Sequence, residues 1–144
     1  MKFIDLFAGL GGFHIALESL GHECVFASEK KEHLAKLYEK NFEIEVNRDI
    51  TKVKIEEIPN FDILCAGFPC QPFSNAGLRK GIDDERGNLF EECEKLLIEG
   101  LSRKNKPVGF VFENVKGIMS SKMADGTSIP DEIVKRTIFN NEIE

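Results

Sequence analysis

The sequence predicts an α/β protein built on a doubly wound, mostly parallel sheet. Short apolar runs alternate along the chain with segments whose apolar residues recur every three or four positions, the order that is typical of such sheets. The runs are nearly continuous, as expected for strands that are buried on both faces. With 144 residues, of which 42% are hydrophobic, the chain is expected to form one domain with a sizeable core.

The first half of the chain predicts three strands and two helices. The strands are expected at Lys2–Phe7, Cys24–Ser28 and Ile44–Val46. The first helix is predicted from apolar residues at helical spacing, namely Phe13, Ala16, Leu17 and Leu20. Gly21 is expected to end it, because glycine is common just after a helix. The second helix is predicted over Glu32–Asn41, with an inward face of Leu34, Leu37 and Tyr38.

The second half predicts two further strands, at Asp62–Ala66 and Val108–Phe112. A long glycine-rich loop from Gly67 to Gly87 is expected after the first of them. Helical spacing recurs in two groups, which are Leu89, Phe90, Cys93, Leu96 and Leu97, and later Ile133, Val134, Thr137 and Ile138. Since no later strand is evident, Val108–Phe112 is expected at an edge of the sheet, open to pairing with another chain.

The composition argues against membrane insertion and against a metal site. No apolar stretch reaches about 18 residues, and the chain starts as a strand rather than as a signal peptide. The four cysteines, Cys24, Cys65, Cys70 and Cys93, show no zinc-binding spacing. Free thiols fit a reducing compartment, so we expect a cytoplasmic protein without a metal.

Residues 67–74 read Gly-Phe-Pro-Cys-Gln-Pro-Phe-Ser and come directly after an apolar strand. Pro69 and Pro72 each fix φ and restrict the preceding residue, so the loop is expected to be stiff near Cys70. A thiolate held there could be presented to a substrate. An isolated cysteine is more often a small core residue, and two other segments decide between these interpretations.

Those segments are Phe3–Gly12, which reads Phe-Ile-Asp-Leu-Phe-Ala-Gly-Leu-Gly-Gly, and Phe112–Val115, which reads Phe-Glu-Asn-Val. Together with the Pro-Cys-Gln of residues 69–71, they resemble the DNA cytosine-5 methyltransferase family in order and spacing. The resemblance runs from Met1 to about Lys116. It implies a Rossmann-like, S-adenosylmethionine-dependent methyltransferase fold that is incomplete at its carboxyl-terminal side. Residues 1–144 would then be the amino-terminal part of a catalytic domain, without a target-recognition domain.

The glycine cluster between the first strand and its helix predicts a ligand site. Gly9, Gly11 and Gly12 would let the backbone turn tightly and approach a ligand, and the helix start favours a negative group. Their spacing is not G-x-G-x-x-G, which weakens a dinucleotide interpretation. Glu29, at the end of the second strand, could bond ribose hydroxyls or be a solvated surface glutamate. Asp49 could cap the turn that follows it.

The resemblance assigns the donor pocket in more detail. It implies that Glu29 bonds the ribose of S-adenosylmethionine and that Asp49 accepts from the adenine amino group. Lys30 stands where a residue that packs on adenine is expected, and its alkyl stem could do so. The other residues that the resemblance places at the donor are Phe7, Ile50, Gly67, Pro69 and Leu89.

The resemblance also implies the chemistry at the base. Carbon 5 of cytosine is a poor nucleophile, and addition of the Cys70 thiolate to carbon 6 would turn the ring into an enamine. Glu113 would protonate ring nitrogen 3, and Asn114 would fix the loop or bond to the Cys70 region. The base must leave the duplex to react. Residues expected to contact the target nucleotide or its phosphates are Gln71, Ser74 and Arg86.

The favoured function is therefore transfer of a methyl group from S-adenosylmethionine to carbon 5 of cytosine in double-stranded DNA. The alternative is a non-catalytic donor-binding or interaction module. A small-molecule or RNA methyltransferase is disfavoured, because simple transfer to oxygen or nitrogen needs no thiol. The net charge of −6 gives little attraction to phosphate, so we expect a complementary chain that carries target recognition, or self-association. A split subunit, a truncated gene product and a fragment all stay open.

Overall fold

The computed structural model describes residues 1–68, 88–120, 122 and 126–138. The chain divides into two compact units, one formed by Met1–Gly67 with Glu99–Glu113 and the other by Phe68–Ile98 with Asn114–Glu144. The first unit contains the whole sheet, and the second contains the last helix and most of the helix before it.

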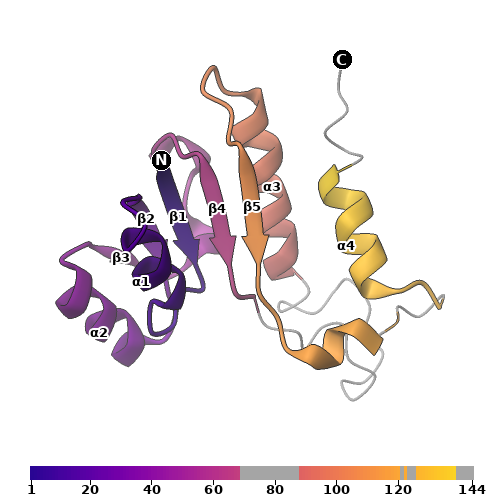
Figure 1. Ribbon diagram of the computed structural model, residues 1–144, viewed down its shortest axis with the longest axis horizontal. Helices are drawn as coiled ribbons and strands as arrows, with labels where there is room; N and C mark the ends of the chain where they lie inside the picture. The colour runs from indigo at the N-terminus through magenta and orange to yellow at the C-terminus, as the bar shows by residue number, and fades with distance from the viewer. Residues whose placement is uncertain (69–87, 121, 123–125, 139–144) are drawn as a thin grey trace. The chain divides into compact units, whose positions relative to one another are not determined.

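Five parallel strands form the sheet in the order β3-β2-β1-β4-β5 (Figure 1). The strands are β1 (Lys2–Leu6), β2 (Glu23–Ser28), β3 (Val46–Asn47), β4 (Ile63–Ala66) and β5 (Gly109–Phe112). Parallel neighbours cannot be joined by a tight turn, so each connection must cross over. This arrangement confirms the predicted α/β class and the parallel sheet.

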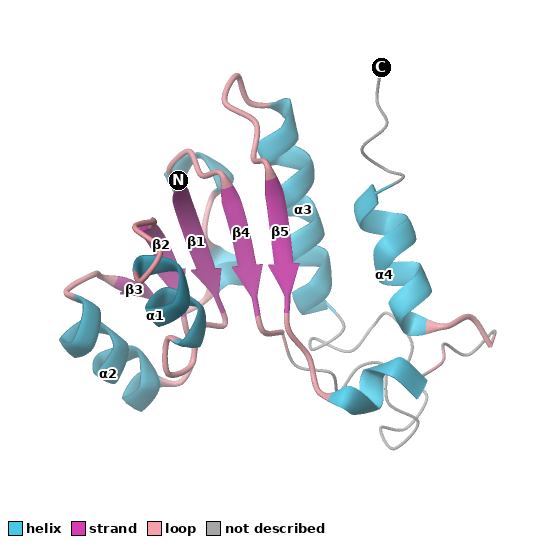
Figure 2. Cartoon of the chain, viewed as in Figure 1, coloured by secondary structure: helices cyan, strands magenta, loops and turns pink. Residues whose placement is uncertain are grey.

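Helices alternate with the strands along the chain (Figure 2). They are α1 (Gly12–Glu18), α2 (Glu32–Phe42), α3 (Asn88–Ser102) and α4 (Ile129–Ile138). Short 3-10 helices cover Ile50–Lys52, Ile55–Glu57 and Lys116–Ser120. Every predicted helix is present, although α1 ends before the predicted Gly21, which follows in a turn with φ of 78°. None of the helices in the described part of the chain has the length and apolar character needed to cross a membrane.

The central strands carry the core of the first unit. The residues of β1 and β4 that are 0% exposed are Phe3, Ile4, Asp5, Leu6, Leu64, Cys65 and Ala66. Their positions are consecutive within each strand, so both faces of the central sheet are covered. This burial explains why the two segments read as nearly continuous apolar runs, in which β1 is interrupted by Asp5, rather than as alternating patterns.

The sequence-based predictions were wrong about the end of β1 and about the inward face of α2. β1 ends at Leu6 rather than Phe7, because Phe7 adopts a φ of 56° that no strand accommodates. On α2 the buried side chains are Ala35 and Tyr38, whereas Leu37 is 42% exposed. Residues three apart share a helix face, and Leu37 lies about 100° around the helix from Tyr38.

The strand β5 lies at an edge of the sheet, which confirms that prediction for the described residues. Its apolar side chains are only partly covered: Phe110 is 37% exposed, Val111 46%, and the preceding Val108 72%. An edge strand presents main-chain groups that can pair with another chain. The edge therefore combines the main chain of an outer strand with partly exposed apolar side chains.

In the second unit, α4 is joined to α3 by an ion pair between Arg136 and Glu94. The guanidinium of Arg136 also lies 5.2 Å from the ring centroid of Phe90, a cation–π distance. Phe90 in turn packs against Phe68, with ring centroids 5.5 Å apart. These contacts hold Phe68, which precedes the segment that carries Cys70, within the core of the second unit.

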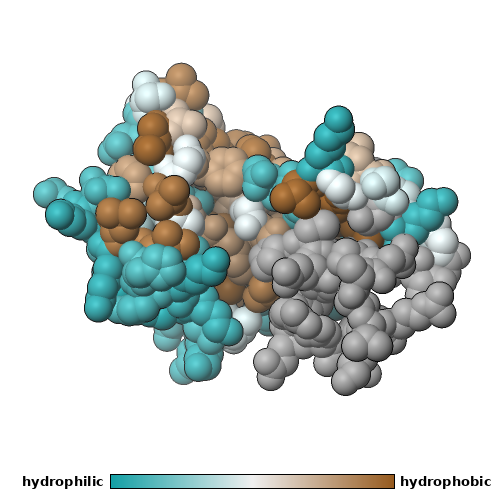
Figure 3. Space-filling model, turned by 90° about the horizontal axis from the view of Figure 1, so that it is seen from below, coloured by the Kyte–Doolittle hydropathy of each residue, from teal (hydrophilic) through white to brown (hydrophobic). Residues whose placement is uncertain are grey.

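The strands of the first unit end at the same level. Register pairs Leu6 with both Ser28 and Ala66, Ser28 with Asn47, and Ala66 with Phe112. Residues that follow these strands therefore share the carboxyl edge of the sheet. Figure 3 is seen from the side toward which the strand arrows point. Hydrophilic residues gather at its lower left, and hydrophobic residues lie above them and toward the middle.

Candidate active site

The turn after β1 is held against the end of β2 by the main chain. The N–H of Ala8 donates to the carbonyl of Ser28 at 2.9 Å, and the N–H of Gly11 donates to the carbonyl of Ala8 at 2.8 Å. Phe7, Gly9 and Gly11 have φ values of 56°, 57° and 83°. A bulky residue in this left-handed region is an outlier that costs about 1–3 kcal/mol and is typical of functional turns.

The three predicted glycines differ in what a side chain at their position would meet. A Cβ on Gly11 would lie 2.3 Å from Cε2 of Phe42 and 3.1 Å from Cε2 of Tyr38, so packing within the chain excludes any larger residue. At Gly9 only the φ favours glycine. Outside its neighbours in α1, a Cβ on Gly12 would meet no atom of the described residues within 4 Å. The start of α1 therefore faces open space, where a ligand has room to approach the backbone.

Glu29 is buried at the end of β2, so the interpretation as a solvated surface glutamate was wrong. Its residue is 8% exposed. Oε2 accepts the N–H of Gly9 at 3.0 Å, and Oε1 accepts the N–H of Lys31 at 2.7 Å. The carboxylate thus ties the glycine turn to the loop after β2. Each oxygen keeps further lone-pair capacity for a ligand.

Asp49 caps the short helix that follows β3, as the sequence suggested. Its Oδ1 accepts the N–H of Thr51 at 3.2 Å and the Thr51 hydroxyl at 2.7 Å. These hydrogen bonds lower the pKa of Asp49, so the group stays ionised. The following Ile50 is 5% exposed, and Lys30 lies exposed in the loop between β2 and α2.

A buried cluster of polar side chains lies beside the glycine turn. Asp5 and Tyr38 are 0% exposed and His14 is 4% exposed. The Tyr38 hydroxyl donates to Oδ2 of Asp5 at 3.1 Å and lies 2.7 Å from Nδ1 of His14. Since that hydroxyl already donates to Asp5, Nδ1 of His14 is assigned as the donor. The ring of His14 stacks on Phe42 at 4.0 Å. The cluster links β1, α1 and α2 on the side of Gly11 that faces Phe42 and Tyr38.

Asp5 is expected to make stability depend on pH. Burial raises its pKa from 3.8 to about 7, and the hydrogen bond from Tyr38 offsets this only in part. The folded chain then binds this proton more tightly than the unfolded chain. Stability should fall as pH rises from about 4 to about 7 and then level off, by on the order of 4 kcal/mol in total. Urea unfolding across this range measures the slope, and an Asp5→Asn variant with the same slope would contradict it.

Glu113 follows β5 and lies next to the residue that follows β4. Its N–H donates to the carbonyl of Ala66 at 3.0 Å. A Cβ built on Gly67 would lie 3.4 Å from Oε2 of Glu113, so the carboxylate lies within van der Waals distance of position 67. Glu113 is exposed at this edge. The carboxylate therefore stands beside the first residue of the segment that carries Cys70.

Asn114 restrains the start of the same segment within the second unit. Its Nδ2 donates to the carbonyl of Phe68 at 2.9 Å, and its Oδ1 accepts the N–H of Val115 at 2.9 Å. Phe68 is 3% exposed. The contact supports the sequence-based idea that Asn114 fixes the geometry of the loop.

Of the remaining candidate site residues, one lies in the part of the chain that the structure describes. Leu89 is half-buried in the first turn of α3. The candidates that lie outside the described residues are Pro69, Cys70, Gln71, Ser74 and Arg86.

The described cysteines are poor candidates for a thiolate. Burial raises the pKa of Cys24 to about 11 and that of Cys65 to about 12, and it raises the pKa of Cys93 as well. A raised pKa keeps a thiol protonated at neutral pH and slows its attack on an electrophile. The nucleophile is therefore not expected among these three.

A sequence model of C-5 cytosine-specific DNA methylases matches residues 1–135. The chain belongs to this family. This methylase chain is 45% identical over 144 residues to Type II methyltransferase M.HhaI from Haemophilus parahaemolyticus, a match that covers 100% of the chain and 41% of the relative. It is 50% identical over 118 residues to Type II methyltransferase M.HpaII from Haemophilus parainfluenzae, covering 81% of the chain and 32% of the relative. The chain spans less than half the length of these curated relatives.

Solved structures share the methylase fold. The Schizosaccharomyces pombe Dnmt2 methyltransferase aligns with a TM-score of 0.69 at 24% identity, covering 94% of this chain and 41% of that chain. A Spodoptera frugiperda DNMT2 mutant aligns with a TM-score of 0.65 at 26% identity, with the same two coverages of 94% and 41%. The Rossmann-like methyltransferase fold predicted from the sequence is therefore confirmed.

Proposed function

We propose that this chain binds S-adenosylmethionine at the carboxyl edge of its sheet and contributes Cys70 to methyl transfer onto carbon 5 of cytosine in double-stranded DNA. The observation that carries the proposal is that residues predicted for this chemistry follow all five strands. They are Phe7, Glu29, Asp49, Gly67 and Glu113. In doubly wound sheets, ligands bind at this edge.

The residues present fit the methyl donor. Glu29 and Asp49 follow adjacent strands, and their oxygens can accept from ribose hydroxyls and from an adenine amino group respectively. The open space beside Gly12 leaves room for a ligand at the start of α1, where the helix dipole favours a carboxylate. When bound, the donor supplies an electrophilic methyl group on a positively charged sulfur.

The chain's own residues would prepare the cytosine. The Cys70 thiolate forms a bond to carbon 6, and the displaced electron pair makes carbon 5 nucleophilic. Glu113 delivers a proton to ring nitrogen 3, which removes the negative charge that the addition would create. After carbon 5 is methylated, loss of its proton and departure of the thiolate restore the aromatic ring. Asn114 holds the carbonyl of Phe68, two residues before Cys70, at 2.9 Å.

The donor site is tested by removing its buried acid. Glu29→Ala should weaken binding of S-adenosylhomocysteine, the demethylated product, by about tenfold or more, since it deletes an acceptor and loosens the glycine turn. Glu23→Ala is the matched control, because Glu23 is exposed at the opposite end of β2. Calorimetry on the three proteins gives the affinities. Equal affinity in the Glu29→Ala and Glu23→Ala variants would remove Glu29 from the site.

The catalytic proposal is tested by a methylation assay on duplex DNA. We expect no useful rate from the chain alone, because its net charge of −6 provides little attraction to phosphate. Activity should appear when a complementary chain that carries target recognition is added, and sedimentation should then show a complex. The position of β5 at the edge of the sheet, with Val111 46% exposed, supports such an association. A monomeric chain that methylates duplex DNA unaided would contradict the need for a partner.

The second candidate function is a donor-binding module without catalysis. The negative net charge favours this candidate, since such a module does not need to bind DNA. The assay separates the two candidates, because the module would bind S-adenosylhomocysteine but stay inactive with every complementary chain.

A further inference from the structure

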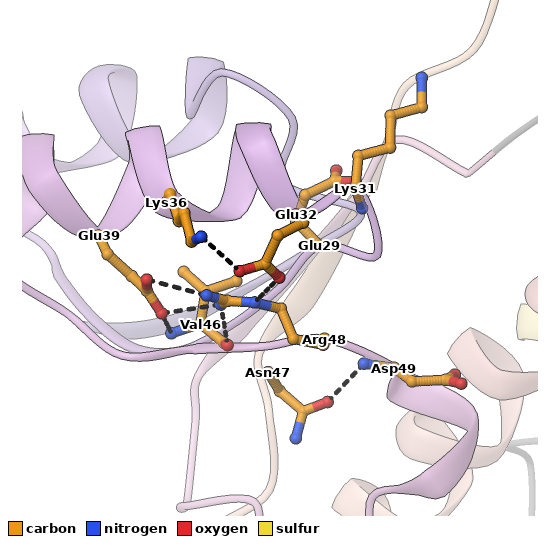
Figure 4. Close-up of polar contacts among 9 residues, drawn as sticks. All are labelled: Glu29, Lys31, Glu32, Lys36, Glu39, Val46, Asn47, Arg48 and Asp49. Carbon is orange, nitrogen blue, oxygen red and sulfur yellow. Dashed lines mark hydrogen bonds and ion pairs between the residues drawn. The ribbon is translucent and has the colours of Figure 1, made fainter.

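Arg48 links the end of β3 to α2 through every nitrogen of its guanidinium (Figure 4). Nη1 and Nη2 donate to the two carboxylate oxygens of Glu39 at 2.7 Å and 3.0 Å. Nε donates to Oε2 of Glu32 at 2.9 Å. Nη1 also donates to the carbonyl of Val46 at 2.6 Å. This bidentate pair with a second carboxylate is the geometry to which a planar guanidinium is suited.

The two glutamates form one attachment surface on α2. Glu32 and Glu39 lie two turns apart on the same face of the helix. Glu39 also accepts the N–H of Val46 at 3.1 Å through Oε1. The strand β3 consists of Val46–Asn47 alone, so its own ladder provides few hydrogen bonds. The hydrogen bonds of Arg48 therefore make up a large share of the contacts that hold β3 and the residues after it in place.

The segment that Arg48 fixes carries the acidic side of the donor site. The N–H of Asp49 donates to Oδ1 of Asn47 at 2.9 Å, and the N–H of Glu29 donates to the carbonyl of Asn47 at 2.9 Å. Figure 4 shows the guanidinium of Arg48 directed toward α2, whereas the carboxylate of Asp49 points the other way. Arg48 thus restrains the main chain next to Asp49, and its guanidinium does not lie on the side to which the Asp49 carboxylate points.

We propose that Arg48 is a positioning residue of the donor site, which holds Asp49 in place relative to Glu29 by tying the end of β3 to α2. The inference rests on the proposed function for its effect on donor binding. Exposed ion pairs usually contribute little one at a time, but a networked bidentate pair is the exception. The pairing with Arg48 lowers the pKa of Glu39 to about 2 and also lowers that of Glu32, so both stay ionised at neutral pH.

Amide hydrogen exchange on the ligand-free chain tests the link itself. Arg48→Gln should reduce the protection of the Asp49 and Glu29 amides by about fivefold or more. Lys36→Gln is the matched control, because Lys36 bonds Glu32 at 3.3 Å but makes its ion pair within α2. That variant should leave both amides within about twofold of wild type. Unchanged protection in Arg48→Gln would overturn the proposal.

Calorimetry with S-adenosylhomocysteine tests the consequence for the donor. Arg48→Gln should weaken S-adenosylhomocysteine binding by about fivefold. Arg48→Lys should not restore the affinity, since a single ammonium cannot make the two parallel hydrogen bonds of a guanidinium with a carboxylate. In an Asp49→Asn background, Arg48→Gln should add little, because the two residues act as a unit. Fully additive losses would overturn the proposal. A wild-type chain that binds no donor would instead contradict the proposed function, and the exchange result would still decide whether Arg48 fixes the segment.

Discussion

Replacing Cys70 by serine is expected to abolish methyl transfer while leaving donor binding nearly unchanged. A serine hydroxyl is scarcely ionised at neutral pH, whereas a thiolate is accessible, so the addition to carbon 6 loses its nucleophile. The rate should fall by more than about a thousandfold. Transfer of a labelled methyl group to DNA by the complemented enzyme gives the rate, and calorimetry with S-adenosylhomocysteine shows that the variant is folded.

Cys24→Ser provides the matched control for this substitution. It makes the same chemical change at a half-buried cysteine, 3.8 Å from the Tyr38 hydroxyl, that has no part in the proposed chemistry. Most of the activity should remain in this variant. An active Cys70→Ser enzyme would remove Cys70 from the mechanism, whatever the control shows.

Replacing Gly11 by alanine is expected to destabilise the fold by about 2–4 kcal/mol and to eliminate donor binding. The new Cβ would lie 2.3 Å from Phe42, and the φ of 83° disfavours any residue with a Cβ. Phe42 also stacks on His14, so its displacement would disturb the buried cluster with Asp5. Thermal and urea unfolding measure the loss.

Gly12→Ala separates packing from ligand approach. Among the described residues outside α1, its Cβ would meet no atom within 4 Å. Alanine is also a better helix former than glycine, so stability should be unchanged or slightly higher. Donor affinity should nevertheless fall, because the methyl group would occupy the open space at the start of α1. A Gly11→Ala protein as stable as wild type would show that the turn relaxes more easily than its geometry indicates.

The fold could be predicted because strands that are buried on both faces need apolar residues at nearly every position. Strands such as β4, whose Leu64 and Cys65 are 0% exposed, read as unbroken apolar runs. The helix faces were harder to predict. Leu37 was chosen for its apolar side chain but is 42% exposed, whereas Tyr38, which was also predicted to face inward, is buried and donates its hydroxyl to Asp5 at 3.1 Å. The periodicity argument favoured large apolar side chains and missed the small Ala35, which is 0% exposed.

The candidate site was predicted by residue type but not by its internal connections. Glu29 was selected as an acid after a strand, while its hydrogen bond to Gly9 at 3.0 Å depends on how the turn folds back. The pairing of Arg48 with Glu39 depends in the same way on the approach of α2 to β3. Asp5, an acid flanked by apolar residues in the first strand, was the available signal for the buried cluster. Such contacts arise from tertiary structure, and short-range spacing does not encode them.

The central claim is that Cys70 forms a covalent bond to the target cytosine. A duplex in which 5-fluorocytosine replaces cytosine is incubated with S-adenosylmethionine and the complemented enzyme, and the protein is then digested for peptide mass spectrometry. Fluorine at carbon 5 cannot leave as a proton does, so the adduct should persist after methyl transfer and map to the peptide that contains Cys70. An adduct on Cys65 or Cys93, or methylation of ordinary DNA by an enzyme that forms no adduct with the fluorinated duplex, would contradict the account.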